Sequence, residues 1–212
     1  MILKVAYLPE INTNTGLFGL SDLLDQVERQ PIGCSPWKEY ACADVQAGFA
    51  IVQGKDCIAL KYYVREAFSN PVYFNANDPV YRDSCVEFFI GFNTDAGYYN
   101  FEFNNAGTCL LGFGTGRERK YLPKSLIDQI SYCRSFKSKG MESLIEWELT
   151  LVIPFEVFCF HTIRKLEGPS CRGNFFKCGD DLPEPHYLAW NNITTDSPNF
   201  HLPEYFGLID FV

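Results

Sequence analysis

Hydrophobic and polar residues alternate along much of this chain with the period of two that is typical of β-strands. The alternation is clearest from Asp78 to Phe113, where three runs are separated by turns at 93–97 and 104–107. Both turns are rich in Asn and Gly, which tolerate the backbone of a tight hairpin. This stretch therefore predicts a three-stranded antiparallel meander around which the rest of the chain is organised.

The two faces of this predicted meander differ in chemistry. The apolar face carries Val86, Phe88, Ile90, Phe92, Tyr99, Phe101 and Phe103, and the opposite face carries Cys85, Glu87, Phe89, Tyr98, Asn100, Glu102 and Asn104. Carboxylates and amides form strong hydrogen bonds with hydroxyl groups, and flat aromatic rings suit the C–H side of a pyranose. The second face could therefore hold a sugar. The alternative is that Glu102 and Asn104 are solvated and the tyrosines cover the edge of the core.

The rest of the pattern predicts more strands and little helix. Further strands are predicted at 47–52, 57–64, 131–136, 143–153 and 206–211. One short helix is predicted at 21–28, capped by Ser21, after an irregular or short extended start. Residues 114–128 are predicted as a polar loop. Trp147 is in phase with Leu149, so it is expected in the core, as is Trp37.

Many short strands separated by turn signals predict an all-β fold with few short helices. We expect a single-domain antiparallel β-sandwich of the immunoglobulin-like or jelly-roll-like kind. In this prediction, residues 1–31 form an N-terminal lead that contains the short helix, and residues 32–212 form the sandwich.

Composition and charge exclude some classes of partner. The chain has 212 residues, with 18 Lys and Arg against 26 Asp and Glu, and a net charge of −8. A nucleic-acid or anionic-membrane partner is not expected, because phosphate groups require clustered positive charge. No apolar run approaches the ~18 residues that a membrane-spanning helix needs.

The cysteines and the start of the chain predict a cytoplasmic location. The first residues lack the basic and apolar regions of an export signal. Nine cysteines, an odd number, are spread through predicted strands, which suggests free and mostly buried thiols in a reducing compartment. Cys171 and Cys178 are too far apart for a zinc knuckle, so a zinc site that combines them with the three His is not expected.

Three segments of the chain resemble carbohydrate-binding module family 9, in its bacterial single-domain form. They are 83–90 (DSCVEFFI), 98–104 (YYNFEFN) and 172–207, which begins RGNFFKCGD. The similarity extends from about Ile32 to Phe211. It implies a non-catalytic β-sandwich that binds mono- or oligosaccharides of the xylan or cellulose type in carbohydrate catabolism, with a glycoside hydrolase as a candidate partner and calcium as a candidate ion. The oligomeric state stays open.

In this family two tryptophans hold a sugar between their rings, and Glu, Arg and Asn side chains bind its hydroxyls. The resemblance places Tyr81 at the first ring position, where a smaller ring is a departure from the family. It matches the second ring to Trp190, which could instead be a core tryptophan under a loop. The candidate ligand-binding residues are Tyr81, Arg82, Glu87, Asn100, Glu102, Trp190 and Asn191. Arg82 could also form an ion pair with Asp83.

Calcium requires six to eight oxygen ligands. Two groups of residues offer some of them: Asn75, Asn77, Asp78 and Asp83, and Asp180, Asp181 and Glu184. Neither group has a recognisable loop spacing. The metal candidates are therefore Asp78, Asp83, Asp180 and Asp181, on the strength of the resemblance.

Two other functions are considered. Glu87 and Glu102 lie on adjacent predicted strands and could act as the acid and base of a glycoside hydrolase. A protein-interaction or haem-binding sandwich is the third class. Haem generally needs a His/Met or His/His pair, and Met1 and Met141 are the only methionines. His186 and His201 lie in proline-flanked loops, where ordinary hydrogen bonds are expected.

Overall fold

The computed structural model describes residues 1–92, 95–138 and 144–212, and strands dominate it. The strands are β1 (Ile2–Tyr7), β2 (Gln30–Pro31), β3 (Gln46–Gln53), β4 (Cys57–Glu66), β5 (Cys85–Phe92), β6 (Tyr98–Asn104), β7 (Cys109–Gly114), β8 (Arg119–Tyr121), β9 (Ser131–Ser138), β10 (Ile145–Pro154), β11 (Gly168–Cys178), β12 (Tyr187–Ala189) and β13 (Gly207–Phe211). The α-helices of these ranges are α1 (Leu17–Leu24) and α2 (Lys124–Ile127), and 3-10 turns lie at Lys38–Tyr40, Val80–Arg82, Phe155–Val157 and Pro203–Tyr205. The predicted all-β class is confirmed.

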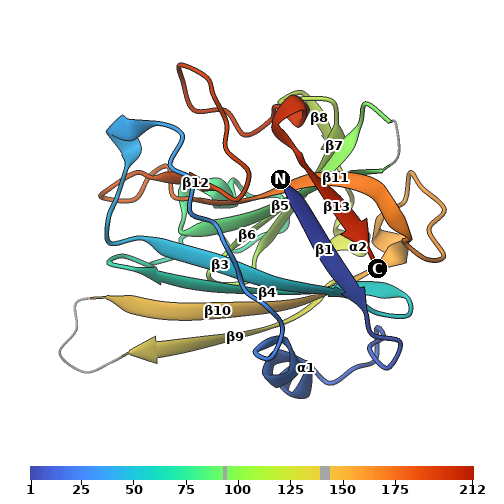
Figure 1. The fold of residues 1–212 in the computed structure, drawn as a ribbon. Helices are drawn as coiled ribbons and strands as arrows, with labels where there is room; N and C mark the ends of the chain where they lie inside the picture. Colours follow the sequence, from blue (N-terminus) through green and yellow to red (C-terminus); the bar gives the residue numbers. More distant parts are fainter. Residues whose placement is uncertain (93–94, 139–143) are drawn as a thin grey trace.

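The strands form two layers that face each other and are joined along one edge by β1 (Figure 1). The first layer has the order β8-β7-β6-β5-β11-β13-β1, and the second has the order β1-β3-β4-β10-β9. Residues Ile2 to Val5 pair in parallel with β13, whereas Ala6 and Tyr7 pair in parallel with β3. All other strand pairs within the described residues are antiparallel. The start of the chain is thus part of both layers.

Some boundaries differ from the predicted ones. Helix α1 starts at Leu17, so Ser21 lies inside it, and no side chain caps its first turn. Its position is set by Leu20 and Leu24, which are buried against the second layer. The predicted loop 114–128 contains β8 and α2, because β8 pairs with β7. The predicted turn residues Asn93 and Thr94, and the predicted strand start at Ser143, lie outside the described residues.

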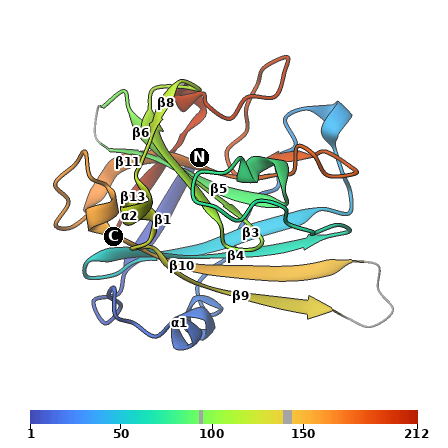
Figure 2. The same ribbon diagram turned by 180° about the vertical axis from the view of Figure 1, so that it is seen from behind.

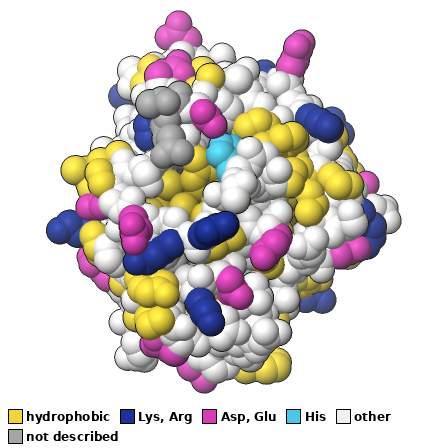
Figure 3. All heavy atoms as spheres, turned by 90° about the vertical axis from the view of Figure 1, so that its right-hand side faces the viewer, with side chains coloured by type: hydrophobic (Ala, Val, Ile, Leu, Met, Phe, Trp, Pro, Cys, Tyr) yellow, Lys and Arg dark blue, Asp and Glu magenta, His cyan; other side chains and the backbone are white. Residues whose placement is uncertain are grey.

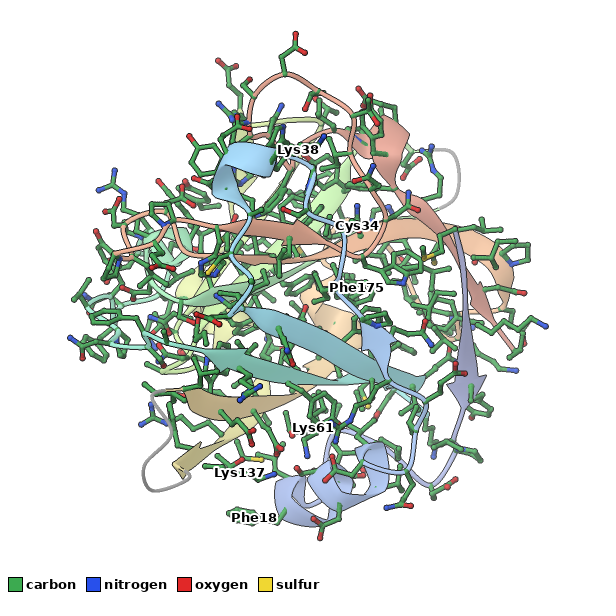
Figure 4. All side chains as sticks on the ribbon, turned by 60° about the vertical axis from the view of Figure 1, so that its left-hand side comes forward. Phe18, Cys34, Lys38, Lys61, Lys137 and Phe175 are labelled. Atoms are coloured by element: carbon green, nitrogen blue, oxygen red, sulfur yellow. The ribbon has the colours of Figure 1, made fainter. Side chains whose placement is uncertain are left out.

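The core fills the space between the two layers. The ring of Phe175 on β11 stacks on Phe49 of the second layer at 3.6 Å and on Phe88 of its own layer at 4.7 Å. Figure 4 shows Phe175 between the layers. Trp147 is buried in the same core, as its alternation with Leu149 predicts. Interlocking rings therefore fix the distance between the layers.

Helix α1 covers the outer face of the second layer, and it lies on the far side from the first layer in both views (Figures 1 and 2). Beneath it lies the buried ammonium of Lys61, whose Nζ is 2.7 Å from Asp25 Oδ1 and 3.1 Å from Glu148 Oε2. In Figure 4, Lys61 points from β4 toward α1, whereas Phe18 points away from the molecule. Lys61 can be buried here because two carboxylates balance the charge of its ammonium group.

The outer face of the first layer is covered by loops. The segment 33–44, in which Figure 4 labels Cys34 and Lys38, bridges to Ala189 of β12. Trp37 is buried there, in a second apolar cluster separate from the core between the layers. The cluster consists of Trp37, Val80, Cys85, Phe89, Tyr98, Leu110, Phe176, Cys178, Ala189, Ile193 and Phe200.

On the face drawn in Figure 3, neither sign of charge dominates, and basic and acidic side chains are interspersed with hydrophobic ones.

Of the helices in the described ranges, none has the length and apolar character that crossing a membrane requires.

Candidate functional site

A cavity of about 360 Å³ opens on the outer face of the first layer, over β5, β6 and β8. Small-molecule sites commonly have volumes from ≈ 300 Å³ upward, so this one suits a small ligand. The residues that line it are Tyr81, Glu87, Glu102, Arg117, Arg119, Tyr121, Cys178, Asp180, Tyr187, Pro198, Asn199, Phe200 and His201.

The floor of the cavity is built by strand alternation. Glu87 of β5 and Glu102 of β6 are direct partners in the antiparallel register, so their side chains leave the sheet on the same face. They are only 3% and 2% exposed. Arg119 of β8 donates from Nη2 to Glu102 Oε1 at 2.9 Å, and Asn100 Nδ2 donates to the same oxygen at 2.8 Å. The charge of Glu102 is therefore balanced by a direct ion pair, whereas Glu87 forms no such pair within the described residues.

The carboxyl groups of Glu87 and Glu102 differ in protonation state because their surroundings differ. Burial raises the pKa of Glu87 well above its ordinary value, and the negative charge of Glu102 raises it further. Burial also raises the pKa of Glu102, to about 7, against the lowering effect of Arg119 and Asn100. We infer that Glu87 holds a proton at neutral pH. It then both donates and accepts hydrogen bonds, whereas Glu102 is the group that becomes charged.

The floor also contains polar atoms that lack a protein partner. Glu102 Oε2 and Arg119 Nε are buried and make no hydrogen bond within the described part of the chain, and neither does Asn100 Oδ1 beside them. A buried polar atom without a partner costs about 1–3 kcal/mol. A polar ligand that meets these atoms would recover part of that cost.

Aromatic rings form the walls of the cavity. Phe200 is held by stacking on Phe176 at 4.1 Å, and Tyr187 packs edge-on against Trp37 at 5.9 Å. Tyr81 lies in the 3-10 turn Val80–Arg82 that precedes β5, and Tyr121 ends β8. The cavity therefore combines a polar floor with apolar sides.

The rim is closed on one side by Arg117. Its Nη2 donates to the backbone oxygen of Pro198 at 2.8 Å, and its Nε donates to Asn199 Oδ1 at 3.2 Å. His201 shares a 2.8 Å hydrogen bond between its Nδ1 and the hydroxyl of Tyr98. Burial, together with the charges of Arg119 and Arg117, lowers the pKa of His201 to about 3, so its ring is neutral.

Three of the predicted ligand-binding residues, Tyr81, Glu87 and Glu102, line the cavity together. Asn100 supports them through its bond to Glu102. Arg82 is not a lining residue. It is exposed, and its Nε lies 3.8 Å from Asp181 Oδ2, so the predicted pairing with Asp83 is replaced by one with Asp181.

Trp190 and Asn191 are corrected by the structure. Trp190 is 2% exposed and packs edge-on against Phe49 and Phe175 between the layers. It is therefore a core tryptophan, which was the alternative to a sugar-binding role. Its neighbour Ala189 lies on the outer face, so Trp190 turns inward. Asn191 donates from Nδ2 to the backbone oxygen of Tyr205 and fixes a loop.

The first group of calcium candidates is engaged elsewhere. Asp83 accepts the backbone N–H groups of Val72 and Tyr73 and the side-chain amide of Asn104. Asp78 accepts the backbone N–H groups of Phe74 and Asn75. These carboxylates hold the loop before β5 and do not converge on one point.

The second group is divided. Asp180 lines the cavity, and burial raises its pKa to about 6. Asp181 faces Arg82, and Glu184 Oε2 accepts the thiol of Cys42. The expectation of a calcium site therefore finds no common donor set among the described candidates. Met141, considered for haem, lies outside the described residues.

Arg117, Arg119 and His201 are site residues that the sequence analysis missed. The two arginines fell in a segment predicted as a loop, and His201 was expected only to make loop hydrogen bonds. The sequence does contain one signal for the arginines. Two glutamates on one face of a meander need a nearby cation when they are buried, because a buried negative charge is costly unless it is paired. Tyr187 and Phe200 gave no such signal, because they lie in irregular segments.

Comparison with known proteins identifies the class. A sequence model of carbohydrate-binding family 9 matches residues 20–211. A protein from Bacteroides uniformis ATCC 8492, classed as a carbohydrate-binding protein, has 34% sequence identity and a TM-score of 0.91, covering 100% of this chain and 99% of its own. The chain belongs to carbohydrate-binding family 9, whose members are non-catalytic modules.

More distant solved structures share the fold. Two are of a family 9 module from Caldicellulosiruptor kristjanssonii, one in complex with cellotriose and one with glucose. Each has 14% identity to this chain and covers 100% of it, with 93% and 96% of the other chain and TM-scores of 0.55 and 0.54. A search of curated proteins gave no match.

The hydrolase alternative does not fit this site. Glu87 and Glu102 are neighbours on one floor, and Glu102 is held by Arg119 and Asn100. A hydrolase needs its two carboxyl groups on either side of the bond that is cleaved. The family assignment agrees with a non-catalytic role.

Proposed function

We propose that the cavity binds a neutral mono- or short oligosaccharide of the glucose or xylose type. The observation that carries this proposal is the buried ion pair of Glu102 and Arg119, which lies on the floor below aromatic walls. Because the guanidinium is already balanced by a carboxylate, the floor presents paired donors and acceptors without surplus charge. Vicinal hydroxyl groups match such an arrangement better than a uronic acid does.

Each part of the cavity has a role in this proposal. Protonated Glu87 donates to one hydroxyl, and the ion pair of Glu102 and Arg119 offers a donor and an acceptor to others. Tyr81 and Phe200 cover the C–H faces of the ring. Because a small ligand makes few contacts and must offset the entropy of association, we expect a Kd on the order of 10 μM to 1 mM.

The choice of sugar is supported by the Caldicellulosiruptor modules, which were solved with glucose and cellotriose. Fragments of cellulose or xylan are therefore the first ligands to test. A glycoside hydrolase that releases such fragments is the partner class we propose, and a cytoplasmic location would restrict the ligand to imported short sugars.

The test is isothermal titration calorimetry with glucose, cellobiose, xylose, xylobiose, mannose and galacturonate, with a chelator present. The wild-type chain should bind at least one neutral sugar more tightly than galacturonate. Tyr81→Ala and Glu87→Ala should each weaken binding at least about tenfold, because each removes a contact in the cavity.

Two variants serve as controls. Tyr132→Ala removes an exposed ring on β9, and Arg134→Ala removes an exposed cation on the same strand, away from the cavity lining. Both should bind sugar as the wild type does. Absence of heat across the panel from folded protein, or unchanged binding in Tyr81→Ala and Glu87→Ala, would overturn the proposal.

A further inference from the structure

Two thiols and a carboxyl group converge at the base of the cavity. Cys85 and Glu87 are alternate residues of β5, so both face outward, and Cys178 of β11 is the register partner of Cys85. The two Sγ atoms and a Glu87 oxygen all lie within 4.8 Å of one another. Cys178 Sγ donates to Glu87 Oε1 at 3.1 Å. Each of the three side chains is buried.

This spacing is close to that of a tetrahedral metal site. With metal–sulfur bonds of ≈ 2.3 Å and metal–oxygen bonds of ≈ 2.1 Å, two ligand atoms lie about 3.6–3.8 Å apart. The three atoms therefore need to move by about 1 Å or less to share one ion. Two thiolates and one carboxylate are a soft donor set, which favours Zn²⁺ and similar ions over Ca²⁺ or Mg²⁺.

We propose that Cys85, Cys178 and Glu87 bind a thiophilic divalent cation such as Zn²⁺, with the fourth ligand supplied from the cavity. Glu87 and Cys178 line the cavity, so an ion has a path to the site. As the ion binds, both thiols and the Glu87 carboxyl release their protons to solvent. The positive charges of Arg119 and Lys177 lie close enough to act on these groups and offset part of the resulting negative charge.

Glu87 belongs to both sites, so the ion and the sugar compete for it. The ion would withdraw the proton that Glu87 offers to a hydroxyl group. The metal site itself does not depend on the sugar proposal, because the ion can be titrated without sugar and the sugar with a chelator present. The two proposals can therefore fail separately.

The test is titration of the full chain with Co²⁺ as a spectroscopic substitute for Zn²⁺, in a phosphine reductant that keeps the thiols reduced. We expect one ion per chain, with thiolate-to-cobalt charge transfer and the visible bands of a tetrahedral site. Zn²⁺ should displace the Co²⁺. Cys85→Ala and Cys178→Ala should each lose about half of the charge-transfer intensity and bind at least about 100-fold more weakly.

Cys171→Ala is the matched control. Cys171 lies on the same strand as Cys178 and is also buried, but it belongs to the core between the layers. This variant should bind Co²⁺ as the wild type does. Glu87→Gln should weaken binding and retain the full thiolate charge transfer, which provides a variant that leaves both cysteines in place.

Two outcomes would overturn the proposal. One is the absence of thiolate-to-cobalt charge transfer in the reduced and folded wild-type chain. The other is charge transfer that survives unchanged in both Cys85→Ala and Cys178→Ala, which would assign the signal to other cysteines.

Discussion

At the residue scale, the site depends on what stands next to each carboxyl group. Glu87 and Glu102 are the same residue type on the same face, yet only Glu102 has a guanidinium at 2.9 Å. Their presence on one face could be predicted from strand alternation. Their different charge could not, because it depends on Arg119, which reaches the floor from β8.

Replacement of Arg119 should destabilise the fold through Glu102. Arg119→Ala leaves a buried carboxylate without its cation, which typically costs about 3–5 kcal/mol. We expect a loss of that size in the free energy of unfolding, measured by urea denaturation. The additional change Glu102→Gln should recover much of the loss, because no charge is then buried.

Arg82→Ala is the comparison for this measurement. Arg82 is exposed and its ion pair with Asp181 lies at the surface, so its removal should change the free energy of unfolding by at most about 0.5 kcal/mol. Equal losses in Arg119→Ala and Arg82→Ala, or no recovery with Glu102→Gln, would contradict the assigned role of the buried pair.

His201 should make stability depend on pH. Its pKa is about 3 in the folded chain, below the ordinary 6.5, so the folded state binds fewer protons between these values. The stability from its neutral ring is therefore complete above pH 6.5 and is lost as the pH falls toward 3. Between pH 6.5 and 5, His201→Gln should lose less free energy of unfolding than the wild type, by at most about 1.4 kcal/mol per pH unit.

The difference between the two proteins is the quantity to measure, because Glu87, Glu102 and Asp180 have raised pKa values and act in the opposite direction. Urea denaturation at several pH values gives both curves. Parallel curves for wild type and His201→Gln below pH 6.5 would show that the ring is not held neutral.

At the element scale, long strands could be predicted and short ones could not. The alternation of β5, β6 and β10 fixes which side chains face the core, including Trp147. Strand β12 has only three residues, so it gives too little alternation to show that Trp190 points inward. Strand β8 is equally short and exists because β7 offers a partner, which is why Arg119 was assigned to a loop.

Gly112 of β7 permits β8 to lie close to the floor. A Cβ at this position would lie 2.7 Å from Asn100 Oδ1 and 2.9 Å from Arg119 Cδ. Gly112→Ala should displace both side chains and weaken sugar binding at least about tenfold in calorimetry. The displaced atoms belong to the groups that hold Glu102.

Gly116 is a matched control in the connection between the same two strands. A Cβ there meets nothing within 4 Å. Gly116→Ala should therefore bind sugar as the wild type does. Unchanged binding in Gly112→Ala would show that the position of β8 is not important for the ligand.

At the scale of the whole molecule, β1 makes the two layers one unit. The β-sandwich class could be predicted from the many short strands, but the shared strand β1 could not, because a strand of six residues gives no sign of its partners. Its parallel pairing with β13 and β3 joins segments that are about 200 and 50 residues away.

Truncation of Val5 should therefore lower the stability of both layers together. Val5 is fully buried in the core, and its truncation to Ala removes packing at the junction. Val5→Ala should lower the midpoint of urea unfolding, and far-UV circular dichroism and tryptophan fluorescence should follow one transition. Lys4→Ala, at an exposed position of β1, should leave the midpoint unchanged. Two separate transitions would show that the layers unfold independently.

The pairing of β1 also has a consequence for synthesis on the ribosome. Ile2 pairs with Leu208 and Val5 with Phe211, so β1 leaves the ribosome about 200 residues before β13, one of its two neighbours. Contacts between such distant segments form slowly, and an unpaired strand edge is prone to aggregate in the meantime. The sandwich can therefore close only after β13 has left the ribosome, and until then β1 is the strand of the nascent chain that a chaperone would have most reason to cover.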